Sequence, residues 1–391
     1  MNTFNIPIYT EFAECQDCYK CVRECPVKAI KIEDYHASII PELCIHCGHC
    51  VEMCPVDAKQ VRNDLIRVKT WLRLGKKIVI SIAPSWQTEF PEYNSEEIVK
   101  ILEQCGFEYV SETALGAEEI NAHQIEILKN NPGLHLSSAC PVVTKLIEDY
   151  YPQYSQFIVP IASPMIAHAK MLRTMIPEDY MIVFAGPCYA KKRESDENQK
   201  LISAAITFAD LNNLFRENKV NPQALGRGSF FPRSAQEGVV YPVDGGMISG
   251  LKQNCGVLEA NYHTISGIGN IIASLADLEI PQTEETIFVE LMACEGGCVN
   301  GPGKISKKSY LKKRIDLIAK NCKRVKQTEQ DISDNVQHEY SSITHETPGI
   351  TDEKLKGILH SIGKDRAEDL LNCGSCDMAA RFFRKYYENL K

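Results

Sequence analysis

Two cysteines four residues apart, Cys294 and Cys298, lie in a glycine-rich stretch and have the residue types for metal chemistry. They follow the apolar run Ile287–Leu291, which predicts a buried strand that ends where the thiols begin. Glycine lets a backbone approach an object that is too bulky for side chains to pack around. Soft thiolates in such a loop suit iron–sulfur chemistry better than hard cations. Taken alone, the pair is also compatible with half of a zinc site or with two core cysteines.

Eight further cysteines form two copies of one motif near the N-terminus. Each copy reads Cys-x2-Cys-x2-Cys-x3-Cys-Pro, and the second follows the first at an offset of 29 residues. In this spacing three thiolates surround one iron–sulfur cube and the fourth reaches the other cube. We therefore expect one cluster on Cys15, Cys18, Cys21 and Cys54, and a second on Cys44, Cys47, Cys50 and Cys25. Residues 1–65 resemble a bacterial two-cluster ferredoxin, which implies one-electron transfer.

Two more thiols stand at the ends of predicted strands. Strands are predicted over 134–138 and 180–187, and they end close to Cys140 and Cys188. In α/β architectures, ligands lie beyond the carboxyl ends of parallel strands. Together with the glycine-rich pair, these thiols could supply the four thiolates of one more cubane.

The remaining pattern favours the same architecture. A strand is predicted over 76–85, and amphipathic helices over 95–106 and 117–130. The glycine-rich turns at 241–247 and 266–270 are expected to lie close to the same cofactor. Three isolated cysteines are expected to be small core residues: Cys105, Cys255 and Cys322.

Composition limits the classes of partner. The chain has 391 residues, a net charge of −8 and 17 cysteines, with no apolar run of the roughly 20 residues that span a membrane. The negative charge argues against nucleic acid and anionic membranes as partners. The first ten residues lack the features of a signal peptide. We therefore expect a cytoplasmic protein whose thiols bind metal rather than form disulfides.

The three thiol loops resemble the signature loops of the iron-only ([FeFe]) hydrogenases. The family motif Glu-x-Met-Ala-Cys-x-x-Gly-Cys is matched from Glu290 to Cys298, and Pro-Cys-x-x-Lys from Pro187 to Lys191. The family's Thr-Ser-Cys-Cys-Pro corresponds to residues 137–141. The resemblance covers roughly residues 5–310.

This resemblance implies a set of site residues. Cys140, Cys188, Cys294 and Cys298 would hold the cubane of the H-cluster, and Cys298 would bridge it to a diiron unit. That unit carries carbon monoxide, cyanide and azadithiolate, and maturation proteins make it. Lys191 would donate to one cyanide, Pro84 and Ser85 would meet the other, and Met292 would flank the bridging carbonyl.

The departures from the family pattern fall along its usual proton route. Ala139 replaces the relay cysteine, and a methyl group cannot carry a proton. One relay glutamate is retained as Glu119, whereas Ala122 and Val159 replace the next two polar positions. Gly186 stands where a methionine often occurs. Alanine at the first position is typical of the sensory branch, which implies a protein that binds hydrogen and turns over slowly.

Three functional hypotheses follow. The first is a hydrogen-reactive sensory protein that passes electrons through its ferredoxin clusters to an unknown redox or signalling partner. The second is a hydrogenase-like electron-transfer or cluster-assembly protein without the diiron unit. The third is a fully active hydrogenase whose protons travel through Glu118, Glu119, Glu295 or ordered water.

The expected architecture is a ferredoxin-like α+β module at 1–65 and a two-lobed α/β hydrogenase domain at 66–320, with parallel sheets flanked by helices. A polar linker at 321–350 and a small helical tail at 351–391 complete the chain, with a helix expected over 351–362. The tail contains Cys373 and Cys376, which match the start of a family cluster motif. The motif's third cysteine is replaced by Arg381, so we expect a docking element there rather than a cluster.

Overall fold

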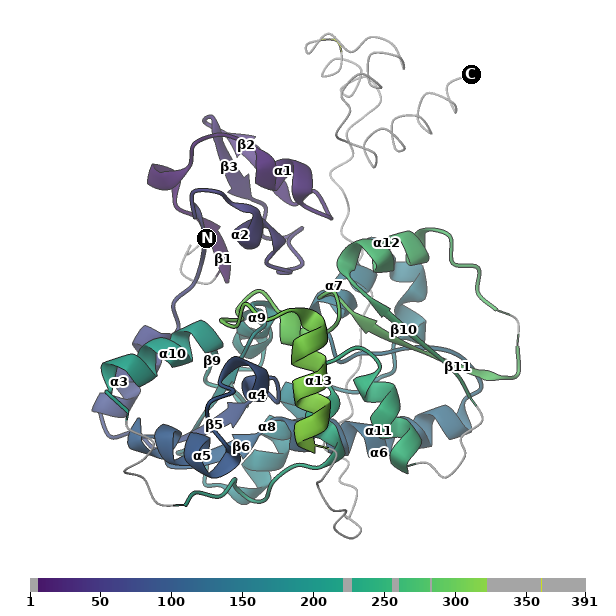
Figure 1. Cartoon of the computed structure of the whole chain (residues 1–391). Helices are drawn as coiled ribbons and strands as arrows, with labels where there is room; N and C mark the ends of the chain where they lie inside the picture. The colour runs from purple at the N-terminus through teal and green to yellow at the C-terminus, as the bar shows by residue number, and fades with distance from the viewer. Residues whose placement is uncertain (1–5, 221–226, 255–259, 282, 322–359, 361–391) are drawn as a thin grey trace.

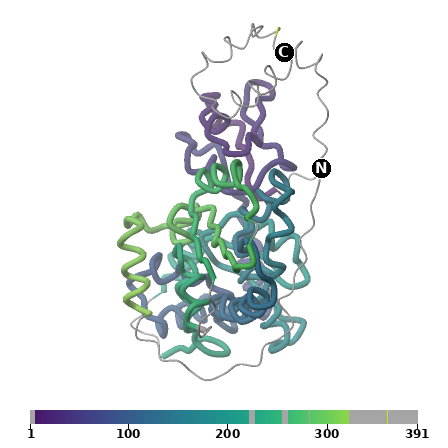
Figure 2. Tube along the Cα trace, turned by 90° about the vertical axis from the view of Figure 1, so that its right-hand side faces the viewer, coloured from purple at the N-terminus to yellow at the C-terminus, as the bar shows by residue number. Residues whose placement is uncertain are grey.

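The computed structural model describes residues 6–220, 227–254, 260–281, 283–321 and residue 360. The predicted linker and tail, including Cys373 and Cys376, lie outside the described residues, as do Cys255 and Cys322. A small cysteine-rich module lies at one end of a larger α/β part, as two perpendicular views show (Figure 1 and Figure 2). Within the described part, no helix is both long enough and apolar enough to span a bilayer.

The small module preserves the sequence duplication in its backbone. Its secondary structure comprises the antiparallel pairs β1 (Ile8–Thr10) with β4 (Lys59–Val61) and β2 (Ile30–Glu33) with β3 (His36–Ile39), and the helices α1 (Lys20–Glu24) and α2 (His49–Met53). Left-handed backbone recurs at the 29-residue offset: Asp17 with His46, Tyr19 with Gly48, and Lys28 with Asp57. Each copy therefore wraps its cysteines with the same turns.

The larger sheet of the α/β part has four parallel strands in the order β6–β5–β8–β9. The strands are β5 (Ile78–Ile82), β6 (Tyr109–Glu112), β8 (Met181–Gly186) and β9 (Ala204–Thr207). The helices that accompany it are α3 (Leu65–Arg73), α4 (Trp86–Glu89), α5 (Ser95–Gln104), α8 (Pro164–Met175), α9 (Ala190–Glu197) and α10 (Phe208–Glu217). Every residue of β5 is buried, as expected for a central parallel strand that is covered on both faces.

The second sheet has three parallel strands in the order β10–β11–β7. They are β7 (Gly133–Leu136), β10 (Ala260–Ser266) and β11 (Thr286–Met292). The helices of this lobe are α6 (Ala114–Asn130), α7 (Pro141–Tyr150), α11 (Gly246–Asn254) and α12 (Ile268–Ala276). Helix α6 packs against α8 of the first lobe and against α11 and β11 of the second, so it joins the two sheets.

The predicted α/β architecture is confirmed. The strands expected before Cys140, Cys188 and Cys294 are β7, β8 and β11, and all three belong to parallel sheets. Cys105 lies in the hydrophobic core, as predicted. Because parallel strands end at one edge of a sheet, the thiol loops are delivered to the region between the lobes.

The ferredoxin-like module is held against the α/β part by polar contacts. Arg62 makes a bidentate ion pair with Asp196 of α9, at 2.8 and 3.0 Å. The Tyr150 hydroxyl donates to the carbonyl oxygen of Leu43 at 2.6 Å. Gly48 has a φ of +82°, and a Cβ there would come within 2.7 Å of the Tyr189 ring. The two parts therefore meet without room for a side chain at this point.

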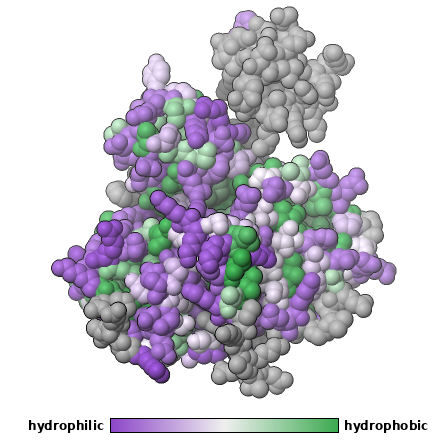
Figure 3. Space-filling view, in the orientation of Figure 1, coloured by the Kyte–Doolittle hydropathy of each residue, from purple (hydrophilic) through white to green (hydrophobic). Residues whose placement is uncertain are grey.

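The last described helix, α13 (Tyr310–Asn321), lies against α4. It buries Lys313 and Leu317, whereas Leu311, Ile315 and Ile318 are exposed on its outer face. The space-filling view shows this apolar stripe at the position of α13 (Figure 3).

Candidate metal centres

The three thiol loops meet between the two lobes. Cys140 is the N-cap residue of α7, Cys188 follows β8, and Cys298 opens a short turn beyond β11. Burial, and the neighbouring thiols, raise the pKa of Cys188 to about 11 and also raise the pKa of Cys298. Burial raises the pKa of Cys294 well above its usual value, with further contributions from the other three thiols. The four predicted ligands are thus close enough to act on one another, and an iron–sulfur cluster would hold them as thiolates.

Hydrogen bonds between the loops fix this meeting point. The Ser137 hydroxyl accepts from the backbone N–H of Leu291 at 2.9 Å, and the Gly303 N–H donates to the carbonyl oxygen of Pro187 at 2.7 Å. Gly297 has a φ of +103°, and a Cβ there would lie 2.5 Å from the Pro242 carbonyl oxygen. The third loop therefore needs glycine both for its conformation and for its close approach to the turn at 241–247.

A cavity of about 90 Å³, here called the thiol cavity, opens beside these cysteines. Cys140, Cys188 and Cys298 line it. The predicted site residues Pro84, Ser85, Ala139, Lys191 and Met292 line it as well. Tyr241, Pro242 and Met247 of the glycine-rich turn complete the wall, as do Met165 and Phe184. The wall is largely apolar, and its few polar groups come from separate elements.

Lys191 is the charged group of the thiol cavity. Its ammonium donates to the Ser163 hydroxyl at 2.9 Å and to Oε2 of Glu194 at 2.6 Å, and the residue is only 8% exposed. An ammonium has three donors. Two are engaged within the described residues, so one remains for a ligand in the cavity.

Ser85 is the second polar group of the wall. The residue is completely buried, and its hydroxyl has no hydrogen-bond partner among the described residues. A buried, unpaired hydroxyl is costly and marks a place where a ligand or water normally binds. Its position before α4 directs it to the thiol cavity that it lines.

Glu290 positions the two methionines of the wall. Its carboxylate accepts from the backbone N–H of Ile248 at 3.3 Å and is also hydrogen-bonded by the N–H groups of Met247 and Gly245. Burial raises the pKa of Glu290 to about 7, although these N–H groups oppose the shift. The carboxyl thus ties the turn that carries Met247 to β11, which carries Met292.

Two positions of the predicted proton route, Ala139 and Val159, carry apolar side chains that pack together. Ala139 packs against a cluster of buried side chains that includes Val159 and Tyr241. Glu119 does not line the thiol cavity; its carboxylate lies 3.6 Å from Nε2 of His123. Glu118 pairs with Arg233 at 2.8 Å and accepts from the backbone N–H of Gln236.

Gly186, where the family often has methionine, has no room for a side chain. A Cβ at this position would lie 2.6 Å from the ring of Phe184. Phe184 itself lines the thiol cavity. The aromatic ring therefore fills the space beside this position, which explains the glycine.

The ferredoxin-like module gathers its cysteines in two groups. Burial raises the pKa of Cys21, and the thiols of Cys54 and Cys15 add to the shift. Cys18 is exposed, and no described contact joins it to the other three. In the second group, burial and the thiols of Cys44 and Cys25 raise the pKa of Cys47 to about 12 and also raise that of Cys50.

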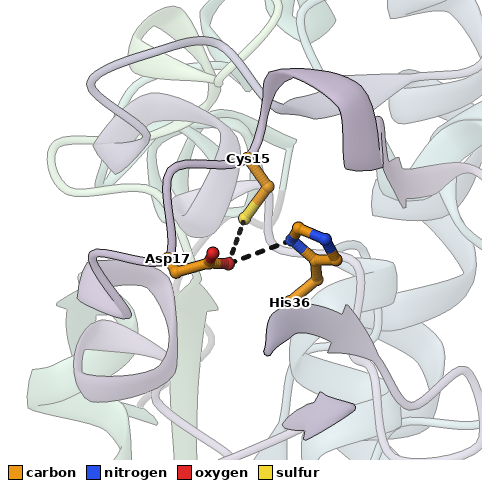
Figure 4. A group of neighbouring side chains, drawn as sticks. All are labelled: Cys15, Asp17 and His36. Carbon is orange, nitrogen blue, oxygen red and sulfur yellow. Dashed lines mark hydrogen bonds and ion pairs between the residues drawn. The ribbon is translucent and has the colours of Figure 1, made fainter. Parts of the chain in front are cut away.

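Backbone N–H groups already point at several of these sulfurs. Ala29 donates to Cys25 at 3.3 Å, His46 to Cys44 at 3.4 Å and Ala58 to Cys54 at 3.2 Å. Such N–H to sulfur contacts stabilise the negative charge of a thiolate cluster. Close to Cys15 lies the pair Asp17 and His36, 3.0 Å apart, with the carboxylate 3.6 Å from the thiol (Figure 4). Because Cys15 belongs to the repeated motif, we interpret this pair as surroundings of the cluster rather than as a separate metal site.

The residues present therefore fit iron–sulfur clusters in the ferredoxin-like module and between the lobes, and a further ligand in the thiol cavity. The donor set is all thiolate, as such clusters require. The unpaired Ser85 hydroxyl and the remaining Lys191 donor fit a ligand that accepts hydrogen bonds.

Comparison with known families identifies both parts of the chain. The family model for the iron only hydrogenase large subunit, C-terminal domain, matches residues 76–302, which is more than half of the chain. A 4Fe–4S dicluster domain matches residues 14–58. The chain therefore belongs to the iron-only hydrogenase family.

Individual relatives are distant. Iron hydrogenase 1 of Clostridium pasteurianum is 23% identical over 362 residues, covering 77% of this chain and 63% of that protein. The chain thus spans less than two thirds of the relative's length. A solved [FeFe]-hydrogenase structure, described for oxygen inactivation through its H-cluster, has a TM-score of 0.51 at 18% identity and covers 68% of this chain and 91% of its own. An [FeFe]-hydrogenase of Chlamydomonas reinhardtii has a TM-score of 0.49 at 18% identity, covering 64% of this chain and 88% of its own.

Sequence reasoning missed several residues of the wall. Met165 and Phe184 line the thiol cavity but carry no motif signal. Phe184 lies on β8, where its type is typical of a core strand. Met165 follows Pro164 at the start of α8, where a methionine is also an ordinary core residue.

Proposed function

We propose that this protein binds an H-cluster in the thiol cavity and reversibly activates hydrogen, H2 ⇌ 2 H⁺ + 2 e⁻, as a slow, sensory member of its family. The observation that carries this proposal is the composition of the cavity wall. Three cysteines, the unpaired Ser85 hydroxyl, the remaining Lys191 donor and Met292 face one small apolar space. A bare cubane on four thiolates would need none of the last three groups.

The roles of the residues follow from their surroundings. The cubane would be held by Cys140, Cys188, Cys294 and Cys298, with Cys298 as the bridge to the diiron unit. When bound, that unit supplies the chemistry that splits or forms hydrogen. Lys191 and Ser85 would donate hydrogen bonds to ligands of the unit, in a largely apolar space. Met292 and Met247 fill the wall with polarizable sulfur.

Slow turnover follows from the apolar proton route. General acid–base groups typically accelerate proton transfer by roughly 10²–10⁴-fold. Ala139 and Val159 cannot hold a proton, and Val159 is 1% exposed, which leaves little space for a water chain. Such a protein would report hydrogen by the redox state of its clusters rather than by converting hydrogen at a high rate.

Electrons would leave through the two ferredoxin-type clusters to a redox or signalling partner. The position of the ferredoxin-like module supports this route, because its segment around Cys44 and Cys47 faces α7 and α9 of the α/β part. Maturation proteins would supply the diiron unit, as the family requires.

The proposal is tested by measuring hydrogen-dependent reduction of the ferredoxin clusters after maturation in vitro with a synthetic diiron precursor. We expect hydrogen to reduce the clusters in the wild-type protein and not in Cys298→Ser, whose ferredoxin clusters should remain intact. Equal responses of both proteins, or no response in the wild type with the precursor bound, would refute the proposal.

A further inference from the structure

A second cavity, of about 100 Å³, lies between the ferredoxin-like module and the α/β part; we call it the polar cavity. Ile45 and His46 of the second thiol motif form one side. Helices α7, α8 and α9 form the rest. Its charged lining consists of Lys145, Glu148, Arg193, Glu194 and Glu197. No residue of the proposed hydrogen chemistry lines it.

The polar cavity is suited to hold water. Its volume is several times the roughly 10–15 Å³ that a cavity needs to hold one water, so it has room for several molecules. His46 is only 5% exposed, and its Nδ1 has no hydrogen-bond partner among the described residues. A water in the cavity would satisfy this buried nitrogen, because the site is both polar and large enough.

The other carboxylates that line the polar cavity form ion pairs within the described residues, whereas Glu148 does not. Lys145 pairs with Asp149 on the same helix, and Arg193 pairs with Glu197 at 2.6 Å. Glu148 forms no ion pair within the described part of the chain. Burial and the nearby Asp149 raise the pKa of Glu148 to about 7, against the opposing influence of Arg193 and Lys145. The residue is half-buried, so it can exchange protons with water at neutral pH.

The same two cations act on the second ferredoxin cluster. Lys145 and Arg193 lower the pKa of Cys44, which burial raises to about 11. The next residue but one after Glu148, Tyr150, donates to the carbonyl oxygen of Leu43, beside Cys44. Burial raises the pKa of Tyr150, with smaller contributions from Asp149, Cys25 and Cys44. The end of α7 is therefore in the electrostatic field of the cluster ligands.

We propose that Glu148 is the redox-linked proton site of the cluster on Cys25, Cys44, Cys47 and Cys50. When this cluster accepts one electron from a one-electron reductant of low potential, the Glu148 carboxylate takes one proton from water of the polar cavity, and solvent replaces that proton. When the cluster is oxidised, the carboxyl returns the proton. The charge between the two parts of the protein then stays constant during electron transfer. The proposal rests on the ferredoxin-type clusters, and it does not require the diiron unit.

The charged surroundings of Glu148 set the direction of the effect. Asp149 from its own helix and Glu197 from α9 add negative charge, whereas Lys145 and Arg193 add positive charge. Glu194 is already paired with Lys191, and His46 stays neutral because burial lowers its pKa to about 3. An additional negative charge on the cluster favours the protonated carboxyl. The midpoint potential should therefore fall as pH rises above about 7.

The test is a potentiometric titration of the full-length protein, followed by electron paramagnetic resonance between about pH 6 and pH 9. Protein made without maturation proteins should carry the iron–sulfur clusters without the diiron unit, which leaves hydrogen chemistry out of the measurement. A tenfold change in proton activity corresponds to about 59 mV for a one-electron couple. We expect one cluster potential to fall toward that slope in the wild type and to become independent of pH in Glu148→Gln.

Glu42→Gln is the control, because Glu42 is an exposed carboxylate two residues before Cys44 and does not line the polar cavity. This variant should keep the slope. A wild-type potential that does not change with pH, a slope that persists in Glu148→Gln, or a slope lost in Glu42→Gln would each overturn the assignment. If Glu148→Gln does not retain its iron, redox-difference infrared spectra of the wild type decide the question. Reduction must then produce a protonated-carboxyl band that shifts in heavy water, and its absence contradicts the proposal.

Discussion

The buried ion pair between Lys313 and Glu89 should stabilise the thiol loops from outside. The Lys313 ammonium lies 2.9 Å from Oε1 of Glu89 and 2.8 Å from the carbonyl oxygen of Val299, and both charged side chains are completely buried. Breaking such a pair by removing one partner costs about 3–5 kcal/mol. The other oxygen of Glu89 keeps the N–H groups of Ile305 and Ser306, at 2.6 and 2.7 Å. We therefore expect Lys313→Met to lower the free energy of unfolding by about 3 kcal/mol, near the lower end of that range.

Tryptophan fluorescence during urea unfolding provides the assay, because Trp86 lies on the same short helix as Glu89 and is 2% exposed. Lys312→Met is the matched control, since Lys312 is exposed and pairs with Asp316 at 2.6 Å on the helix surface. It should cost about 0.5 kcal/mol or less. The double variant Lys313→Met/Glu89→Gln should be more stable than the sum of the single effects predicts. A Lys313→Met cost no larger than that of Lys312→Met, or strictly additive singles, would refute this reasoning.

Three further predictions concern the site itself. Ala139→Cys should raise hydrogen turnover, by less than the roughly 10²–10⁴-fold of a complete acid–base relay, and an unchanged rate would show that protons do not pass this position. Burial raises the pKa of Glu290 from 4.5 to about 7. The folded protein therefore binds this proton more tightly than the unfolded chain does. As pH rises through this interval, the wild type should lose about 3 kcal/mol of stability relative to Glu290→Gln. Urea unfolding of both proteins at a series of pH values measures this difference, and parallel pH profiles would contradict the prediction. If Cys54 completes the cluster of Cys18, the double variant Cys18→Ser/Cys54→Ser should lose one cluster and lack about four irons. Cys18→Ser/Cys25→Ser should lose both clusters of the module and lack about eight irons. The reverse result would exchange the roles assigned to Cys25 and Cys54.

The sequence was sufficient to predict the strands that deliver the thiols. Apolar runs ending in cysteine are local patterns, and β7, β8 and β11 appeared where these runs occur. The helix predicted over 95–106 also formed as α5, with Asn94 and Glu97 making a capping box. Helix α6 begins at Ala114, three residues before the predicted start; its buried first turn contains Gly116, a residue type that disfavours helix.

The arrangement of the strands could not be predicted. β7 lies between β6 and β8 in the chain, yet it pairs with β11 in the other sheet. Strand β10 is exposed at several positions and has no continuous apolar run. The sequence therefore predicted only the glycine-rich turn that begins at its last residue, Ser266. Pairing between distant strands depends on packing that no local pattern encodes.

Long-range polar contacts were equally hidden. Lys313 and Glu89 are 224 residues apart, and each alone is typical of a solvated surface. The unpaired Ser85 hydroxyl and the polar cavity around Glu148 likewise emerge only when separate elements are brought together. The motifs thus predicted which thiols meet between the lobes, whereas the polar groups around them depended on the fold.

The most direct test of the central claim is an infrared spectrum of the anaerobic protein after incubation with a synthetic diiron precursor. Our account predicts carbonyl and cyanide bands that sharpen on binding, respond to hydrogen, and shift in Lys191→Met, because this lysine has a donor left for a ligand in the thiol cavity. Protein that carries all its cubanes but shows no bound bands would contradict the account and favour an electron-transfer or assembly protein without the diiron unit.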